Sequence, residues 1–257
     1  MRTALLSREQ LDKVAAVLPS WLVDKVPRDH HEPDAAFHRR RRVVAGVSVL
    51  GAGLLGVGLS TEPGSAAFYV STLGVAGTWV AGGFASGRLH LGWMATRDDT
   101  YKRPVITPVL TGVGAFGFFY GCALVARHVP VLDRAISSIL TFADQGSTPL
   151  VLLTTLVNGA SEEVFFRGAL YAAVGVDHPV AVSTGVYTVA TMATRNPALV
   201  LAAAVMGALF GLQRRSSGGI QAPVLTHLTW SVLMLRYLPP LFRRPVDGSS
   251  PLGGGHA

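Results

Sequence analysis

The sequence predicts an all-α fold, a polytopic bundle of about seven membrane-spanning helices. Hydrophobic residues make up 49% of the 257 residues and charged residues only 14%, whereas a soluble domain usually carries about 25% charged residues. The mean hydropathy is +0.41, and most of the chain after residue 42 falls in apolar runs near the length of about 20 residues that a spanning helix needs. Too little polar surface remains to cover a soluble core of that size.

The apolar runs set the expected spans. We expect them at 43–59, 66–85, 105–126, 149–174, 179–194, 197–212 and 219–241. The fifth and sixth runs are short, so a re-entrant pair is an alternative there. A short interfacial helix is expected within 127–147.

The runs divide the chain into four segments. We expect a polar cytoplasmic segment at 1–38, with a short amphipathic helix, and N-terminal transmembrane helices with their loops at 39–147. A second group of spans, at 148–241, carries the unusual polar residues, and the tail 242–257 is expected to be disordered.

Basic residues lie between the apolar runs and indicate topology. Arg39, Arg40, Arg41 and Arg42 directly precede the first run, which places the N-terminus in the cytoplasm and favours contact with anionic membrane lipids. The net charge of +7 does not indicate nucleic-acid binding, because the cations follow no single helix face and lack interleaved aromatic residues. The one cysteine, Cys122, excludes an internal disulfide and is expected to be a packing residue.

Three charged residues interrupt the fourth apolar run. Glu162, Glu163 and Arg167 would each oppose membrane insertion by about 2.5–3.5 kcal/mol unless they are paired or face a wet cavity. Glu163 and Arg167 are four residues apart, so they can form an ion pair on one helix face. Glu162 is rotated by about 100° and lacks that partner. A structural ion pair explains Glu163 and Arg167 but leaves Glu162 as a candidate general base.

The last apolar run contains His227, with Ser231 one turn later. A lone histidine in an apolar helix is usually a hydrogen-bonded packing residue, but an unsatisfied imidazole is costly inside a bilayer. We therefore expect His227 and Glu162, on neighbouring helices, to hold and activate a water molecule together.

The segment that contains these charged residues resembles a known protein family. The segment SEEVFFRGALY (161–171) is similar to the EExxxR signature of the CPBP intramembrane proteases, which include CAAX prenyl endopeptidases and bacterial immunity proteins. The resemblance covers about residues 148–238. It implies that Glu162 is the base that activates water, and that Glu163 with Arg167 orders the site. It also implies an integral protein of a bacterial plasma membrane.

Two further family motifs are altered here. The second, FxxxH, corresponds to Tyr187 and Thr191, so threonine stands at the histidine position. The third, HxxxN, corresponds to His227 and Ser231. In the family, the glutamate and two histidines hold a water or a metal ion, and the asparagine donates to the oxyanion. The resemblance thus implies a divalent metal such as zinc, held by Glu162 and His227 if present.

A zinc site built this way would lack a third protein ligand. His178 lies 13 residues before Thr191, about 20 Å along a helix, and is a poor substitute. Two readings follow from the resemblance. The first is an intramembrane endopeptidase that acts on hydrophobic or lipid-modified peptides, with Ser231 steadying the oxyanion. The second is a non-proteolytic membrane scaffold that keeps Glu163 and Arg167 for stability. A transporter could also use buried Glu and His, but no repeat supports it.

Overall fold

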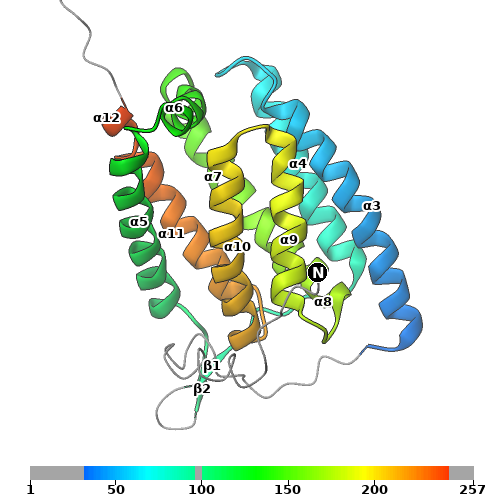
Figure 1. Cartoon of the computed structure of the whole chain (residues 1–257). Helices are drawn as coiled ribbons and strands as arrows, with labels where there is room; N and C mark the ends of the chain where they lie inside the picture. The colour runs from blue at the N-terminus through cyan, green and yellow to red at the C-terminus, as the bar shows by residue number, and fades with distance from the viewer. Residues whose placement is uncertain (1–31, 96–99, 243–257) are drawn as a thin grey trace, which may run out of the picture.

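The computed structural model describes residues 32–95 and 100–242. It is almost wholly helical, which confirms the all-α prediction (Figure 1). The α-helices are α3 Asp34–Gly58, α4 Ala66–Ser86, α5 Ile106–Ala126, α6 Pro130–Gln145, α7 Thr148–Glu162, α8 Tyr171–Val174, α9 Pro179–Thr191, α10 Pro197–Ser217, α11 Gln221–Tyr237 and α12 Pro239–Phe242. A π-helix, η1 Glu163–Leu170, joins α7 to α8, and a 3₁₀ turn, η2 Met192–Thr194, follows α9.

Membrane insertion is supported by both length and exposure. Among the described residues, α3, α5 and α10 are long and apolar enough to cross a membrane. Large apolar side chains on these helices face outward; Val49 and Ile106, for example, are 77% and 72% exposed. Such surface is costly in water and suits lipid. The chain is an integral membrane protein.

The number of seven spans is not confirmed. The expected fourth span is a continuous helical segment over residues 148–174, but it is divided among α7, η1 and α8. The helices α9 and α11 have 13 and 17 residues, at or below the shortest length that crosses a bilayer without help. The expected ends are close to the observed ones for most helices. The exceptions are α3, which begins at Asp34, nine residues before residue 43, and α10, which continues five residues beyond residue 212 to Ser217.

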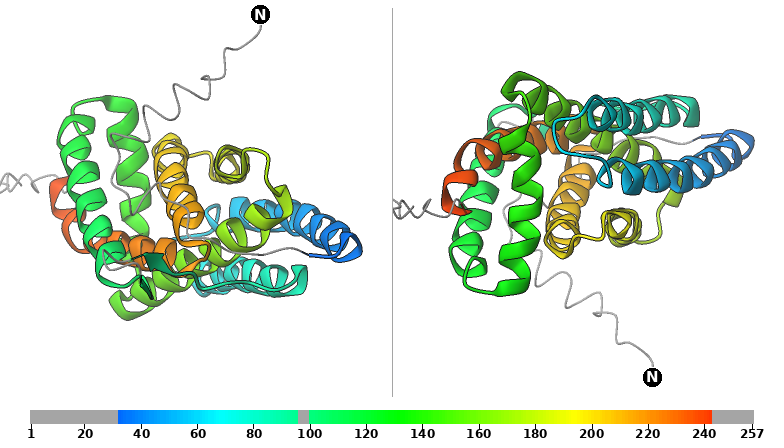
Figure 2. Two further views of the ribbon diagram at one scale, coloured as in Figure 1. Left: turned by 90° about the horizontal axis from the view of Figure 1, so that it is seen from below. Right: turned by 90° about the horizontal axis from the view of Figure 1, so that it is seen from above.

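The helices pack around the segment that carries the carboxylates. α3 and α4 form one antiparallel pair and α9 and α10 another, while α4 and α11 both pack on α7 (Figure 2). At the centre of the core, the Trp79 ring lies 4.6 Å from the Phe165 ring and 5.0 Å from the Phe166 ring, centroid to centroid. These aromatic contacts join α4 to η1 and fix the helix on which the two glutamates lie.

The basic run near the N-terminus lies inside a helix, not before one. α3 begins at Asp34, so the expected segment boundary after residue 38 falls within its first turns. Arg40, one of the four arginines that indicate the orientation of the first span, is only 1% exposed. It donates to Ser86 Oγ at 3.1 Å and to the Arg88 carbonyl at 3.0 Å, and it pairs with Glu32. A hydrogen bond from the Arg40 guanidinium holds the pKa of Glu32 below its ordinary value.

The basic loop after α4 contains a short antiparallel pair, β1 Met94–Ala95 and β2 Tyr101–Lys102, with Met94 opposite Lys102. Backbone bonds attach this loop to the turn between α10 and α11: Trp93 N–H donates to the Ser217 carbonyl, and Ile220 N–H to the His90 carbonyl. The loop therefore fixes the start of α11, the helix that carries His227.

Other expectations are met or lie outside the described residues. The short helix expected within 127–147 is α6, and α7 begins at Thr148. The amphipathic helix expected within 1–38 would lie before residue 32, and the tail beyond residue 242 is likewise not described.

Candidate functional site

The two glutamates lie where an α-helix becomes a π-helix. Glu162 is the last residue of α7, and Glu163 is the first of η1. The sequence predicts one continuous α-helix here, and the wider π-helical turn is a correction to that prediction. Arg214 Nε donates to the Arg167 carbonyl at 2.7 Å, so a neighbouring helix supplies a donor to this irregular backbone. π-Helical turns inside α-helices occur often at functional sites.

Glu163 lies in a closed, charged cluster. Its side chain and that of Arg167 are both 0% exposed. Arg167 Nε is 3.3 Å from Glu163 Oε2, and Arg167 Nη1 donates to Oε1 at 3.4 Å. His227 Nδ1 lies 2.9 Å from the same Oε1. The ion pair expected from the spacing is present, and the imidazole of α11 is an additional partner.

The Glu163 contact determines which nitrogen of His227 donates. A carboxylate paired with arginine only accepts hydrogen bonds, so Nδ1 of His227 carries a hydrogen and donates to Glu163. The ring stacks on Phe210, with centroids 4.8 Å apart and planes at 22°. Gly159 leaves room for it, because a Cβ there would lie 3.3 Å from His227 Cδ2 and 3.4 Å from Nε2. Nε2 therefore lies against α7, one turn before Glu163.

Glu162 has different surroundings. Tyr187 O–H donates to Glu162 Oε2 at 2.6 Å, a short bond typical of a charged acceptor. The same glutamate lines a cavity of about 150 Å³, which is large enough for water. The rest of the lining comes from the end of α3, the start of α4 and one face of α7: Leu55, Gly58, Leu59, Phe68, Thr72, Val75, Thr154, Thr155 and Asn158.

Tyr187 connects the two carboxylates. The Arg167 guanidinium carbon lies 4.5 Å from the centroid of the Tyr187 ring, within the range of a cation–π contact. Arg167 in turn pairs with Glu163, whereas the Tyr187 hydroxyl reaches Glu162. Gly207 of α10 makes this stack possible, because a Cβ there would lie 3.2 Å from Arg167 Nη2 and 3.3 Å from Tyr187 Cδ1.

The structure pairs the histidine differently from our expectation. His227 hydrogen-bonds to Glu163, and no hydrogen bond joins it to Glu162 in the described part of the chain. Ser231 lies one turn later on α11 and is buried, and no hydrogen bond joins it to the other four candidates in the described part of the chain. Sequence reasoning missed Tyr187 as a site residue. Its signal was a phenol within an apolar helix, since a buried tyrosine hydroxyl usually finds a partner.

The donor set does not fit a zinc ion. Glu162 and His227 are the candidate ligands, and Thr191 stands where a third would be needed. The Thr191 hydroxyl donates to the Tyr187 carbonyl at 2.9 Å and is not free to serve the site. Within residues 32–95 and 100–242, no three His, Cys, Asp or Glu side chains are grouped to hold a metal.

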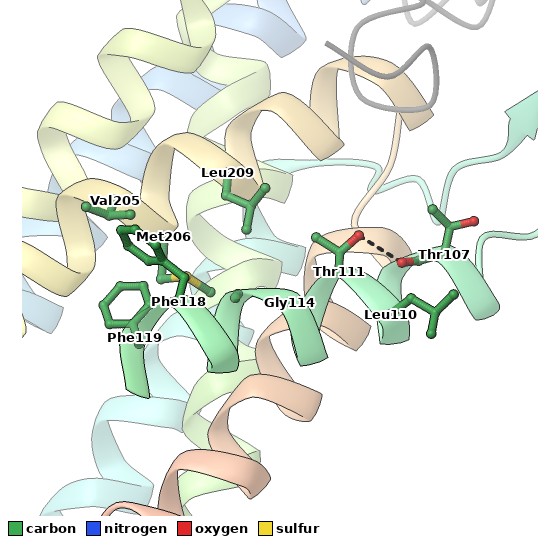
Figure 3. Close-up of a pocket in the computed structure, with 10 residues that line it drawn as sticks. Thr107, Leu110, Thr111, Gly114, Phe118, Phe119, Val205, Met206 and Leu209 are labelled. Carbon is green, nitrogen blue, oxygen red and sulfur yellow. Dashed lines mark hydrogen bonds between the residues drawn. The ribbon is translucent and has the colours of Figure 1, made fainter. Parts of the chain in front are cut away.

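A larger, apolar cavity lies between α5 and α10 (Figure 3). It has a volume of about 580 Å³, and its walls include Leu110 and Phe118 of α5 and Leu209 of α10, with none of the candidate polar residues. An aromatic layer separates it from the histidine: Phe119 lies 5.3 Å from Trp230, and Trp230 lies 5.9 Å from His227, centroid to centroid.

Comparison with known proteins identifies the segment that carries this site. Residues 144–233 match the family described as type II CAAX prenyl endopeptidase Rce1-like. This segment is similar to the Rce1-like family, which is a family of proteases, and the match supports the resemblance to the CPBP proteases. No curated protein and no solved structure matches the chain.

The Rce1-like match runs from the end of α6 into α11, and it includes all five candidate residues and Tyr187. The helices α3 and α4, which complete the cavity beside Glu162, lie before it. The Rce1-like segment thus provides the charged groups, and the preceding helix pair closes the space in front of one of them.

Proposed function

We propose that the chain is an intramembrane endopeptidase in which Glu162 activates the attacking water. The observation that carries this proposal is the division between the two glutamates. Arg167 and His227 both contact Glu163, which is fully buried. Glu162 has one hydrogen bond and lines a cavity that is large enough for water. A general base needs this kind of access to a water molecule.

In the proposed reaction, Glu162 removes a proton from a water in the cavity, and the water oxygen attacks the peptide carbonyl. The tetrahedral intermediate collapses when the proton passes from Glu162 to the leaving nitrogen, which breaks the C–N bond. No acyl-enzyme forms, because the nucleophile is water and not a side chain. Glu163 accepts from Nδ1 of His227 and holds the imidazole ring against α7, beside the turn that carries Glu162. The Ser231 hydroxyl is proposed to donate to the oxyanion.

The proposed substrates are hydrophobic or lipid-modified peptides. The description of the matched family supports this class, and so does the apolar cavity between α5 and α10. The proposed location is a bacterial plasma membrane with a cytoplasmic N-terminus, in contact with anionic lipids through the arginines of α3. The cavity beside Glu162, at the end of α3, would then lie toward the outer face.

A second candidate is a non-proteolytic membrane scaffold. The observation that favours it is Thr191, whose hydroxyl is used by the Tyr187 carbonyl and supplies neither a ligand nor a base. In this reading the cluster of Glu163, Arg167 and His227 only stabilises the helix packing.

Purified protein and a quenched hydrophobic peptide library separate the two candidates. For the endopeptidase, Glu162→Gln should lower hydrolysis by about 10²–10⁴-fold, because a general base contributes that much. Glu62→Gln, at an exposed glutamate in the α3–α4 turn, is the matched control and should keep full activity. Equal cleavage by wild type and Glu162→Gln would exclude Glu162 as the base and would exclude the scaffold as well. No cleavage by either would exclude the endopeptidase and leave the scaffold.

A further inference from the structure

We propose that Tyr187 is the positioning residue that holds the Glu162 carboxylate for water activation. The inference rests on the proposed function and adds a residue to it. In the described part of the chain, Tyr187 is the only side chain that hydrogen-bonds to Glu162. Its hydroxyl binds Oε2 at 2.6 Å, and the carboxylate also lines the small cavity.

The Tyr187 ring is itself held in place. Arg167 lies over one face, 4.5 Å from the centroid, and the Phe166 ring packs at 4.7 Å with the planes at 55°. Gly207 allows α10 to approach the ring edge closely. A phenol fixed by three neighbouring contacts keeps its hydroxyl at a defined point, so the carboxylate it binds loses rotational freedom before substrate arrives.

The rest of helix α9 offers no substitute for this hydroxyl. Thr191, one turn after Tyr187, donates to the Tyr187 backbone carbonyl. Thr188 donates to the Thr184 carbonyl, and the Thr184 hydroxyl is buried without a partner. His227 contacts the other glutamate. The task of fixing Glu162 therefore falls to Tyr187.

The positioning role of Tyr187 and its packing role depend on different parts of the side chain, the hydroxyl and the ring. The ring contacts Arg167 and Phe166, and these contacts do not involve the hydroxyl, so they are expected to remain when only the hydroxyl is removed. Tyr187→Phe should therefore change how Glu162 is held without changing the core.

The test compares Tyr187→Phe with Tyr171→Phe in the full-length purified protein. Tyr171 is the matched control, because Arg214 lies 4.9 Å over its ring and no carboxylate bonds to its hydroxyl among the described contacts. Tyr187→Phe should lower kcat by about 10- to 100-fold, the scale expected for a misplaced catalytic group. KM and the melting temperature should stay near the wild-type values, and Tyr171→Phe should leave kcat unchanged.

A double-mutant cycle tests whether Tyr187 acts through Glu162. Glu162→Asp shortens the side chain and withdraws the carboxylate from the hydroxyl, so adding Tyr187→Phe should cost less than threefold there. If the two losses simply multiply, the inference is wrong.

The remaining outcomes distinguish this inference from the proposed function. Unchanged kcat in Tyr187→Phe, with Glu162→Gln inactive, overturns the positioning role and leaves the endopeptidase intact. Equal activity of wild type and Glu162→Gln overturns both. If Tyr187→Phe melts as low as Tyr187→Leu, the hydroxyl is structural and the inference fails.

Discussion

Two neighbouring residues, Glu162 and Glu163, have opposite surroundings in the same helix. Glu163 is fully buried between Arg167 and His227, so its charge is balanced within the protein. Glu162 faces a small cavity and receives one hydrogen bond from Tyr187. A helix rotates by about 100° per residue, which is enough to direct successive side chains to different neighbours. One of two adjacent carboxylates can therefore stabilise the fold while the other is available for chemistry.

The different surroundings predict that alanine substitutions at the two glutamates lower the stability of the protein by different amounts. Glu163→Ala should lower the free energy of unfolding by about 3–5 kcal/mol, because it leaves the buried Arg167 charge unpaired. Glu162→Ala should cost much less stability, because it removes only the acceptor of the Tyr187 hydroxyl. Melting temperatures and expression levels in a fixed detergent measure both. Equal losses from the two truncations would contradict the division.

A smaller effect is expected at the contact between α7 and the histidine. Gly159→Ala would add a Cβ 3.3 Å from His227 Cδ2 and push the ring away from Glu163, at a cost of about 1–3 kcal/mol. Gly74→Ala, in α4, is the matched control. A Cβ there meets nothing within 4 Å, so the exchange should stabilise the helix by about 0.5–1 kcal/mol. A lower melting temperature for Gly159→Ala, together with a higher one for Gly74→Ala, would confirm the close contact. A Gly159→Ala variant that melts above wild type would exclude it.

The smallest effect is expected at another buried arginine, Arg40, whose partner Glu32 is partly exposed. The Glu32 pKa lies below its ordinary value, so this pair stabilises the fold at neutral pH and stops doing so as the pH falls through the folded-state pKa. Glu32→Gln should therefore melt slightly lower than wild type at pH 7. The difference should disappear at a pH below that pKa, and a difference that persists in acid would be inconsistent with the ion pair.

Much of the fold follows from local sequence. The apolar runs predicted where the helices lie, because helix length and hydropathy are properties of consecutive residues. The spacing of Glu163 and Arg167 also predicted their ion pair, since residues four apart share a helix face. Local pattern could not predict the π-helical turn between them, nor the burial of Arg40 against Ser86 of the next helix.

The partners of the two carboxylates required the tertiary structure. Tyr187 is 25 residues from Glu162, and His227 is 64 residues from Glu163. Which glutamate each one reaches depends on the rotation of three helices about their axes, and packing between helices sets that rotation. The sequence by itself thus determined that this membrane protein carries two glutamates and an arginine within one apolar run. The tertiary structure decided that Glu163 is enclosed by charge and that Glu162 faces the cavity.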